Sequence, residues 1–352
     1  MKQTNNLRII TSEHAITPKD LRTEYPVTET SSETVFHSRN AVMDIIEGRD
    51  DRFLAIVGPC SIHDEDLAID YAQRLNELRL KYEDRLYIMM RVYFEKPRTT
   101  VGWRGMLIDP DMDGSYNINK GLQYARRILS KITDMGLPTA TEVLDPIIPQ
   151  YISDLLSWAA VGARTTESQT HRNMVSGLSM PVGFKNGTDG NIEKAINAIE
   201  TARSPHSFLG IDDDGKTCIL STAGNLSTNL ILRGGKFGPN YYEEAVEEVE
   251  TLFKQNDMDA SIVVDCSHAN SGKKHERQMR VLRSVLEQRT RHSAIHGVMI
   301  ESNIVEGNQK ITSSKSDLIY GQSVTDECVS WETTETMLAY AWEKLGNLGV
   351  GK

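Results

Sequence analysis

The chain has 352 residues, of which 39% are hydrophobic and 25% charged, and its formal net charge is −10 at pH 7. This composition is typical of a globular protein with one large or two medium domains, and the acidic balance argues against nucleic-acid or anionic-membrane binding. No run of about 18 apolar residues and no signal-peptide-like start is present, so we expect a cytoplasmic protein. Four cysteines are too few for a disulfide scaffold and indicate thiols or ligands.

The first 45 residues are polar and carry two breaks, at Thr17-Pro18 and Tyr25-Pro26. They predict an arm or small helices outside the main domain. We therefore divide the chain into an N-terminal extension, residues 1–45, and a catalytic domain, residues 46–352.

From Phe53 onward, short apolar runs alternate with amphipathic segments. The expected strands are Phe53–Val57, Leu86–Val92, Leu137–Val143, Trp158–Ala163, Pro181–Phe184, Asn229–Leu232, Ser261–Val264 and Ile295–Ile300. The expected helices include Leu67–Leu80, Ile147–Leu156, Ile192–Ala202, Glu243–Phe253 and Arg277–Glu287. Eight such repeats predict a (β/α)8 TIM barrel, with a doubly wound open sheet as the alternative.

One segment departs from this rhythm. Residues 206–222 read as two short strands around the Asp214-Gly215 turn, which predicts an inserted β-hairpin. Inserted elements often serve regulation or assembly.

The stretch Arg91–Gly105 follows the second expected strand and holds four cations, Arg91, Lys96, Arg98 and Arg104. Arginine and lysine on a proline-constrained loop are typical of an anion-binding site. A solvated basic loop is the alternative, but the position directly after an apolar strand in an acidic protein favours anion binding.

Two kinds of residue follow the expected strands, namely cations and potential metal ligands. In a barrel the C-terminal ends of all strands meet at one end, so these residues would lie together. Cations lie at or after the ends of four strands: Arg91, Lys96, Arg98, Arg164, Lys185 and Arg233. Potential metal ligands are Cys60, His268, Glu301 and Asp326. Taken alone, Cys60, His268 and Glu301 each have a purely structural interpretation. Their shared position at the strand ends weakens that interpretation.

This set of sulfur, nitrogen and oxygen ligands suits a divalent transition metal such as Mn, Fe, Co, Zn or Cu. It does not distinguish between these metals. The paired cysteine spacing of a closed zinc site is absent, as are nucleotide-binding glycine loops. Cations beside a metal indicate C–C or C–O chemistry on phosphorylated metabolites.

Seven motifs together identify a family resemblance. They are GPCSIHD from Gly58, RVYFEKPRTTVGW from Arg91, GARTTESQ from Gly162, GFKNGTDG from Gly183, LRGGK from Leu232, DCSHAN from Asp265 and EGNQ from Glu306. The chain resembles the microbial type I 3-deoxy-D-arabino-heptulosonate 7-phosphate (DAHP) synthases, most of all the tyrosine-inhibited isozyme. The resemblance implies a (β/α)8 barrel that condenses phosphoenolpyruvate with erythrose 4-phosphate.

The resemblance assigns roles to the strand-end residues. It implies that Cys60, His268, Glu301 and Asp326 are the metal ligands. Phosphoenolpyruvate would meet Arg91, Lys96 and Lys185 at its carboxylate, and Arg164 and Arg233 at its phosphate. Erythrose 4-phosphate would meet Lys96, Pro97, Arg98 and Thr99. Catalysis would rest on Lys96 as proton donor and on the ligands Cys60 and His268.

Two departures from the family pattern are visible. Arg104 stands where many relatives carry lysine, and the loop after Arg233 has an extra residue. Cys328 lies two residues beyond Asp326, so it is either close to Cys60 or a buried free thiol. If the two are close, loss of metal in air should permit a disulfide between them.

The resemblance also implies feedback inhibition by an aromatic amino acid and a homodimer or homotetramer. The implied effector residues are Gln150, Leu178, Ser179, Phe208, Gly210 and Leu220. Because glycine at position 210 would leave room for a phenol hydroxyl, tyrosine is favoured and phenylalanine is the alternative. A metal-dependent aldolase and an amino-acid-sensing barrel without activity are the rival functions.

Overall fold

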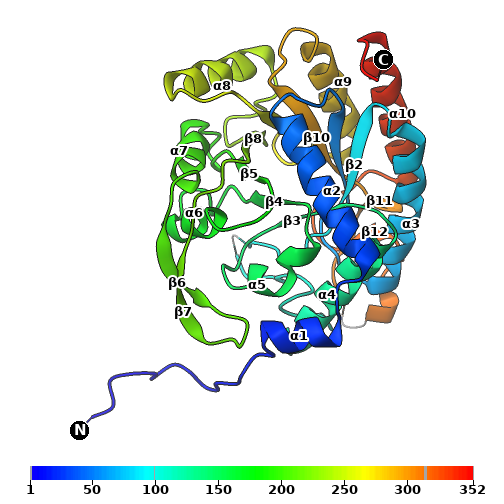
Figure 1. Cartoon of the computed structure of the whole chain (residues 1–352). Coiled ribbons are helices and arrows are strands. Elements are labelled where there is room, and N and C mark those ends of the chain that lie inside the picture. The colour runs from blue at the N-terminus through cyan, green and yellow to red at the C-terminus, as the bar shows by residue number, and fades with distance from the viewer. Residues whose placement is uncertain (1, 99, 313–314, 352) are drawn as a thin grey trace.

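The computed structural model describes residues 2–98, 100–312 and 315–351, and its centre is a closed barrel of eight parallel strands (Figure 1). Around the barrel the order is β1-β10-β9-β8-β5-β4-β3-β2. The strands are β1 Phe53–Gly58, β2 Leu86–Arg91, β3 Thr139–Glu142, β4 Trp158–Val161, β5 Val182–Lys185, β8 Thr228–Leu232, β9 Ile262–Asp265 and β10 Ile295–Glu301. The predicted barrel is confirmed, and closure of the sheet excludes the doubly wound alternative.

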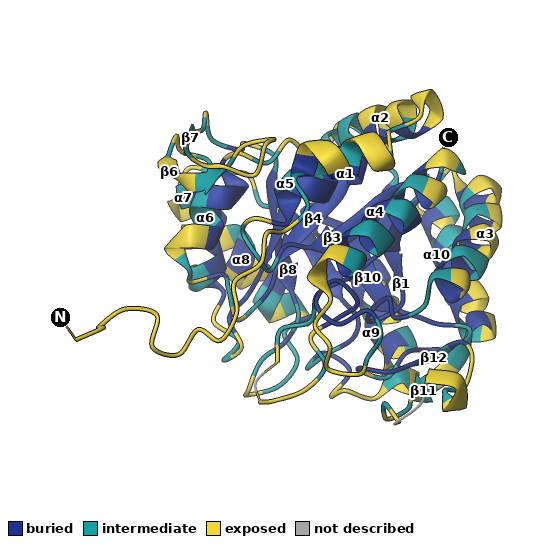
Figure 2. Ribbon diagram, turned by 90° about the horizontal axis from the view of Figure 1, so that it is seen from below, coloured by how far each residue is buried: buried dark blue, intermediate teal, exposed yellow. Residues whose placement is uncertain are grey.

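The strands are apolar because both of their faces are buried. Alternate residues point into the barrel, where Leu54, Trp158 and Ile231 pack in one cluster, while residues such as Phe53 and Val57 face the helices. Continuous apolar runs are what a parallel sheet covered on both sides requires. Figure 2 shows the strands buried at the centre and the outer faces of the helices exposed.

Helices surround the barrel. They are α3 Glu65–Tyr82, α4 Ile118–Asp134, α5 Pro149–Ile152, α6 Gln169–Val175, α7 Glu193–Ala202, α8 Glu243–Gln255, α9 Gln278–Gln288 and α10 Trp331–Asn347. In α3, Asp64 caps the first turn by accepting from the Leu67 N–H, and Leu67, Tyr71, Leu75 and Leu78 form its buried stripe. No helix of the described residues is long and apolar enough to cross a membrane.

The N-terminal part contains α1 Pro18–Glu24 and α2 Glu29–Ile46. The sequence predicted small helices here, but α2 has 18 residues. Its last turn places Val42, Ile45 and Ile46 in the cluster that fills the barrel interior. The end of α2 therefore packs against the interior at the N-terminal end of the barrel, where Leu54 of β1 belongs to the same cluster.

The predicted hairpin is confirmed as β6 Ser207–Ile211 paired antiparallel with β7 Thr217–Ser221, separate from the barrel. It projects beside α6 and reaches α1 at its tip (Figure 1). There the Lys19 N–H donates to the Asp213 carbonyl, and Arg22 pairs with the Asp213 carboxylate at 2.5 Å. A further small sheet joins β11 Val305–Asn308 to β12 Gln322–Ser323.

Candidate active site

A cavity of about 250 Å³ lies where the C-terminal ends of the strands meet. Six cations line it, and they follow five different strands: Lys96, Arg98, Arg164, Lys185, Arg233 and Lys273. In a chain with a net charge of −10, this is a local concentration of positive charge. The cavity is therefore suited to an anionic ligand.

Lys96 and Cys60 face each other at the cavity wall. The Lys96 ammonium donates to the Cys60 carbonyl oxygen at 3.1 Å and to Cys60 Sγ at 3.2 Å. Burial raises the pKa of the Cys60 thiol to about 11, and the Glu301 carboxylate adds to that rise. Burial alone would lower the pKa of Lys96, but Cys60 and Glu301 outweigh it and the pKa lies above its ordinary value. Lys96 is therefore protonated at neutral pH.

Three predicted ligands converge beside Lys96. Donor atoms of Cys60, Glu301 and Asp326 all lie within 4.8 Å of one another. His268 Nε2 lies 4.0 Å from Glu301 Oε1, at the edge of the same cluster. These residues come from the ends of β1, β9 and β10 and from the loop after β12.

The orientation of His268 depends on a residue to which the sequence assigned no role. His268 Nδ1 lies 2.9 Å from Asp265 Oδ2 and 2.7 Å from Ser267 Oγ. Ser267 is hydrogen-bonded to Nδ1, the Asp265 carboxylate lies beside it, and Nε2 is left for the cluster. A carboxylate behind a histidine is the usual second partner of a metal ligand, so the donor set fits a divalent transition metal.

Arg91 is fully buried rather than exposed to the cavity. Its Nη2 donates to Glu301 Oε1 at 3.1 Å, and its guanidinium stacks 4.0 Å above the Tyr93 ring. Its Nε and Nη1 have no hydrogen-bond partner. Gly58 lets β1 approach β2 here, since a Cβ at Gly58 would lie 2.9 Å from the Arg91 carbonyl oxygen. Contact of Arg91 with a substrate stays a prediction.

Lys185 ends β5 and is held between two carboxylates. Its ammonium lies 3.4 Å from Glu142 Oε2 and 3.6 Å from Asp265 Oδ2. Burial alone would lower the pKa of Lys185, but Tyr93, Glu142 and Asp265 together raise it. Burial would raise the pKa of Asp265, yet His268, Lys185 and Arg91 hold it well below its ordinary value. The buried charges are thus mutually compensated.

The remaining predicted substrate residues surround this cluster. Arg233 follows β8, and its backbone N–H donates to Asn186 Oδ1 at 2.9 Å. Pro97, Arg98 and Arg164 line the cavity, whereas Thr99 lies outside the described residues. The loop is closed by the Lys96 N–H donating to the Arg104 carbonyl at 2.8 Å, while the Arg104 side chain is exposed.

Sequence reasoning gave no role to four residues at this site, namely Tyr93, Glu142, Asp265 and Lys273. The Tyr93 ring lies beneath the charged groups of Arg91, Lys96 and Lys185. The carboxylates of Glu142 and Asp265 lie beside the Lys185 ammonium group, and Lys273 lines the cavity. Glu142 and Asp265 could have been found, because both stand at strand ends. Tyr93 and Lys273 lack such a signal.

Cys328 is fully buried. Burial is the main reason that the pKa of its thiol lies well above the ordinary value, and Cys60 adds to that rise. Both cysteines are free in the structure, and the disulfide between them stays a prediction.

None of the six implied effector residues lines the cavity, and Phe208, Gly210 and Leu220 lie on the hairpin. Phe208 and Leu220 are directly opposed across the two strands. A Cβ at Gly210 would lie 2.4 Å from Leu220 Cδ1. The space that glycine creates at position 210 is therefore filled by the Leu220 side chain.

Comparison with known proteins places this geometry in a family. Residues 24–339 match the model described as the DAHP synthetase I family. The chain belongs to this family. It is 51% identical to the Tyr-sensitive phospho-2-dehydro-3-deoxyheptonate aldolase of Escherichia coli, over 95% of this chain and 94% of that one.

Other members of the family are nearly as similar. The Phe-sensitive enzyme of Escherichia coli is 50% identical over 96% of each chain. A solved phospho-2-dehydro-3-deoxyheptonate aldolase from Francisella tularensis has a TM-score of 0.93 at 49% identity, covering 96% of this chain and 98% of that one.

Proposed function

We propose that this protein condenses phosphoenolpyruvate, erythrose 4-phosphate and water to DAHP and inorganic phosphate. The observation that carries this proposal is one cavity in which cations from five strand ends adjoin the Cys60, Glu301 and Asp326 donor cluster. A sugar phosphate and an enol phosphate both require such cations, and polarising an aldehyde requires the donor cluster's metal.

Phosphoenolpyruvate is assigned to the inner part of the cavity. Arg164 and Arg233 would bind its phosphate, and Lys185 and Lys96 its carboxylate, with Arg91 behind them. Lys185 is preorganised for this role because Glu142 and Asp265 already fix its ammonium. Erythrose 4-phosphate is assigned to the segment from Lys96 to Thr99, with Arg98 at its phosphate.

Cys60, His268, Glu301 and Asp326 would hold the metal, of which Mn, Fe, Co, Zn and Cu remain candidates. When bound, a divalent metal polarises the aldehyde carbonyl and stabilises developing negative charge on its oxygen. A direct test is elemental analysis of Cys60→Ala, which should have lost its bound metal. Stoichiometric metal in that variant would contradict the ligand assignment.

The chain's own residues position the reaction and supply the proton. The cations hold C3 of phosphoenolpyruvate against the aldehyde carbon, so that a C–C bond forms as the aldehyde π bond breaks. Lys96, protonated and beside Cys60, donates a proton to the resulting oxygen. Water then adds at C2, and the C2–O bond breaks to release inorganic phosphate.

A phosphate-release assay with both substrates tests the proposal. Phosphate should appear only when both substrates are present and should stop when a chelator removes metal. Aldol product without phosphate release would favour a metal-dependent aldolase. Binding of an aromatic amino acid with no turnover would favour a sensor without activity.

We further propose feedback inhibition by an aromatic amino acid bound at Gln150, Leu178, Ser179, Phe208, Gly210 and Leu220, in a homodimer or homotetramer. Tyrosine is favoured and phenylalanine is the alternative. Tyr-sensitive, Phe-sensitive and Trp-sensitive relatives are 51%, 50% and 48% identical, so overall identity does not separate them. Since Leu220 fills the space beside Gly210, a bound phenol ring requires that side chain to move. Assays with each of the three amino acids decide the effector.

A further inference from the structure

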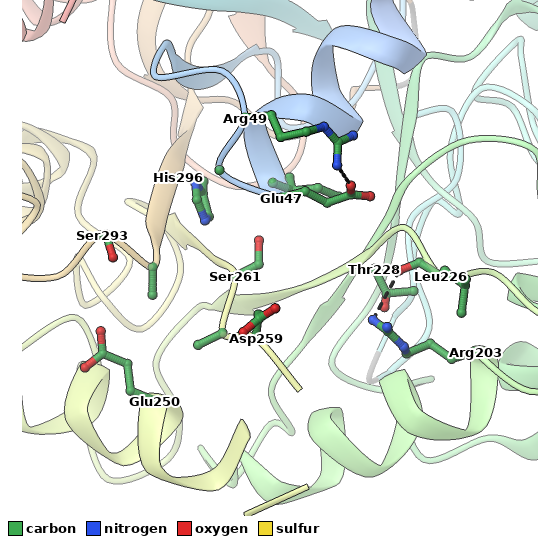
Figure 3. A pocket seen from close by; sticks show the side chains of 14 residues that line it. Glu47, Arg49, Arg203, Leu226, Thr228, Glu250, Asp259, Ser261, Ser293 and His296 are labelled. Carbon is green, nitrogen blue, oxygen red and sulfur yellow. Dashed lines mark hydrogen bonds and ion pairs between the residues drawn. The ribbon is translucent and has the colours of Figure 1, made fainter. Parts of the chain in front are cut away.

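A second and larger cavity, of about 780 Å³, lies at the opposite end of the barrel (Figure 3). It is bounded by the first residues of β8 and β10, by the loop before β9 and by the end of α2. The candidate active site lies at the other ends of the same three strands. The proposed function therefore leaves this cavity without a role.

Buried polar groups of this cavity lack partners. Thr228 and Ser261 are 6% and 5% exposed, and neither hydroxyl oxygen has a hydrogen-bond partner. His296 is 7% exposed, and its ring is directed into the cavity (Figure 3). Burial, helped by Arg289, lowers the pKa of His296 to about 4, so the imidazole is neutral and can donate or accept. Three polar side chains can thus bond to a polar ligand.

Two opposite charges at the cavity have no oppositely charged partner: Arg203 is partly buried, and Asp259 is exposed. Arg203 donates to the Leu226 carbonyl at 3.2 Å, but within the described part of the chain no carboxylate lies within 4.0 Å of it. Asp259 likewise has no cationic partner among the described residues. The other charged groups have partners: Arg49 pairs with Asp44 and Glu47, and Glu250 Oε2 lies 3.1 Å from His292 Nδ1.

We propose that this cavity binds a small zwitterion of the size of a free amino acid, with its carboxylate at Arg203 and its ammonium group at Asp259. Thr228, Ser261 and His296 would then bond to polar groups of its side chain or to remaining atoms of its carboxylate and ammonium groups. A phosphate-sized dianion fits less well, because three carboxylates and only two guanidinium groups line the cavity. The site is separate from the hairpin and takes no part in the condensation.

The test uses the full-length protein carrying Gln150→Ala, which removes a side chain of the proposed hairpin site. Each proteinogenic L-amino acid is titrated separately by calorimetry, with glycerol and inorganic phosphate as non-zwitterionic probes. We expect at least one amino acid to bind. Arg203→Met and Asp259→Asn should each weaken that binding roughly tenfold or more, since each removes a charged hydrogen bond. Lys254→Met, on the exposed side of α8, serves as the matched charge control.

A crystal structure with the bound amino acid should show it between Arg203 and Asp259. The proposal is overturned if no amino acid binds, if both variants bind as tightly as the control, or if glycerol or phosphate binds instead. It is also overturned if the only amino acid in the crystal lies at the hairpin. None of these outcomes depends on turnover, so failure of the condensation assay is a separate result.

Discussion

The two ends of the barrel bury polar groups of different kinds, charged side chains at the C-terminal end and neutral ones at the N-terminal end. At the C-terminal end, Arg91 is paired with Glu301, Lys185 with Glu142, and His268 with Asp265. At the N-terminal end, the hydroxyls of Thr228 and Ser261 have no partner. The two ends are close together, because strand β10 reaches from His296 at one end to Glu301 at the other. At about 3.3 Å per residue these two residues lie about 17 Å apart.

Some buried polar atoms lack a hydrogen-bond partner at both ends, among them Nε and Nη1 of Arg91 at the C-terminal end. The difference is that the buried side chains are charged at one end, each with an opposite charge nearby, and neutral at the other. Buried charges cannot remain uncompensated, so the charged end is built from mutually paired groups. Unpaired hydroxyls cost less, so the other end can keep them. Substitutions at the charged end should therefore alter chemistry and metal binding, and those at the other end should alter stability.

The largest effect is expected for Lys96→Met. This change removes the proposed proton donor, which contacts Cys60, and should lower kcat about 10²- to 10⁴-fold. Phosphate release measures the rate, and elemental analysis should show that metal is retained. Turnover close to wild type would exclude Lys96 as the donor. Lys254→Met, which removes an exposed cation from α8, should leave kcat within twofold.

Asp265→Asn probes the pairing behind His268. The amide no longer offers a carboxylate to His268 Nδ1 and to the Lys185 ammonium group, so metal affinity should fall about 10- to 100-fold. Competition with a chelator measures that affinity. The matched control is Asp257→Asn, in the exposed loop before β9, which should bind metal as wild type does. Equal affinities in the two variants would show that Asp265 does not position the ligand.

The charged end could be predicted from sequence, whereas the other end could not. Parallel strands buried on both faces give continuous apolar runs, so their C-terminal ends, with Lys185 and Glu301, could be located by inspection. The pairing of Arg91 with Glu301 joins residues far apart in the chain, and only the closed barrel brings them together. Thr228 and His296 are single polar residues at strand starts, and nothing in the local sequence distinguishes them.

His296 makes the N-terminal end sensitive to acid. Its pKa is lowered from about 6.5 to about 4 in the folded protein, so only the unfolded chain gains its proton between these values. This contribution to stability is complete above pH 6.5 and is lost as the pH falls towards 4. By linkage it amounts to about 2 kcal/mol between pH 7 and pH 5.

The free energy of unfolding, measured by urea titration, should decrease from pH 7 to pH 5 in both wild type and His296→Gln. The decrease should be about 2 kcal/mol smaller in His296→Gln, because that variant lacks the histidine. His14→Gln, in the exposed N-terminal arm, should behave as wild type. Identical falls in all three proteins would contradict the assignment of acid sensitivity to His296.

The smallest effect is expected for Thr228→Val. Valine has nearly the same shape, favours strands and replaces a buried hydroxyl that has no partner, so the variant should be as stable as wild type or more stable, by up to about 1 kcal/mol. Thr139→Val is the matched control on β3, because its hydroxyl donates to the Leu155 carbonyl at 2.7 Å and its loss should be destabilising. Urea denaturation without added amino acids compares the two. If Thr228→Val were destabilised as much as Thr139→Val, the Thr228 hydroxyl would already be satisfied, and the contrast between the two ends of the barrel would fail at this residue.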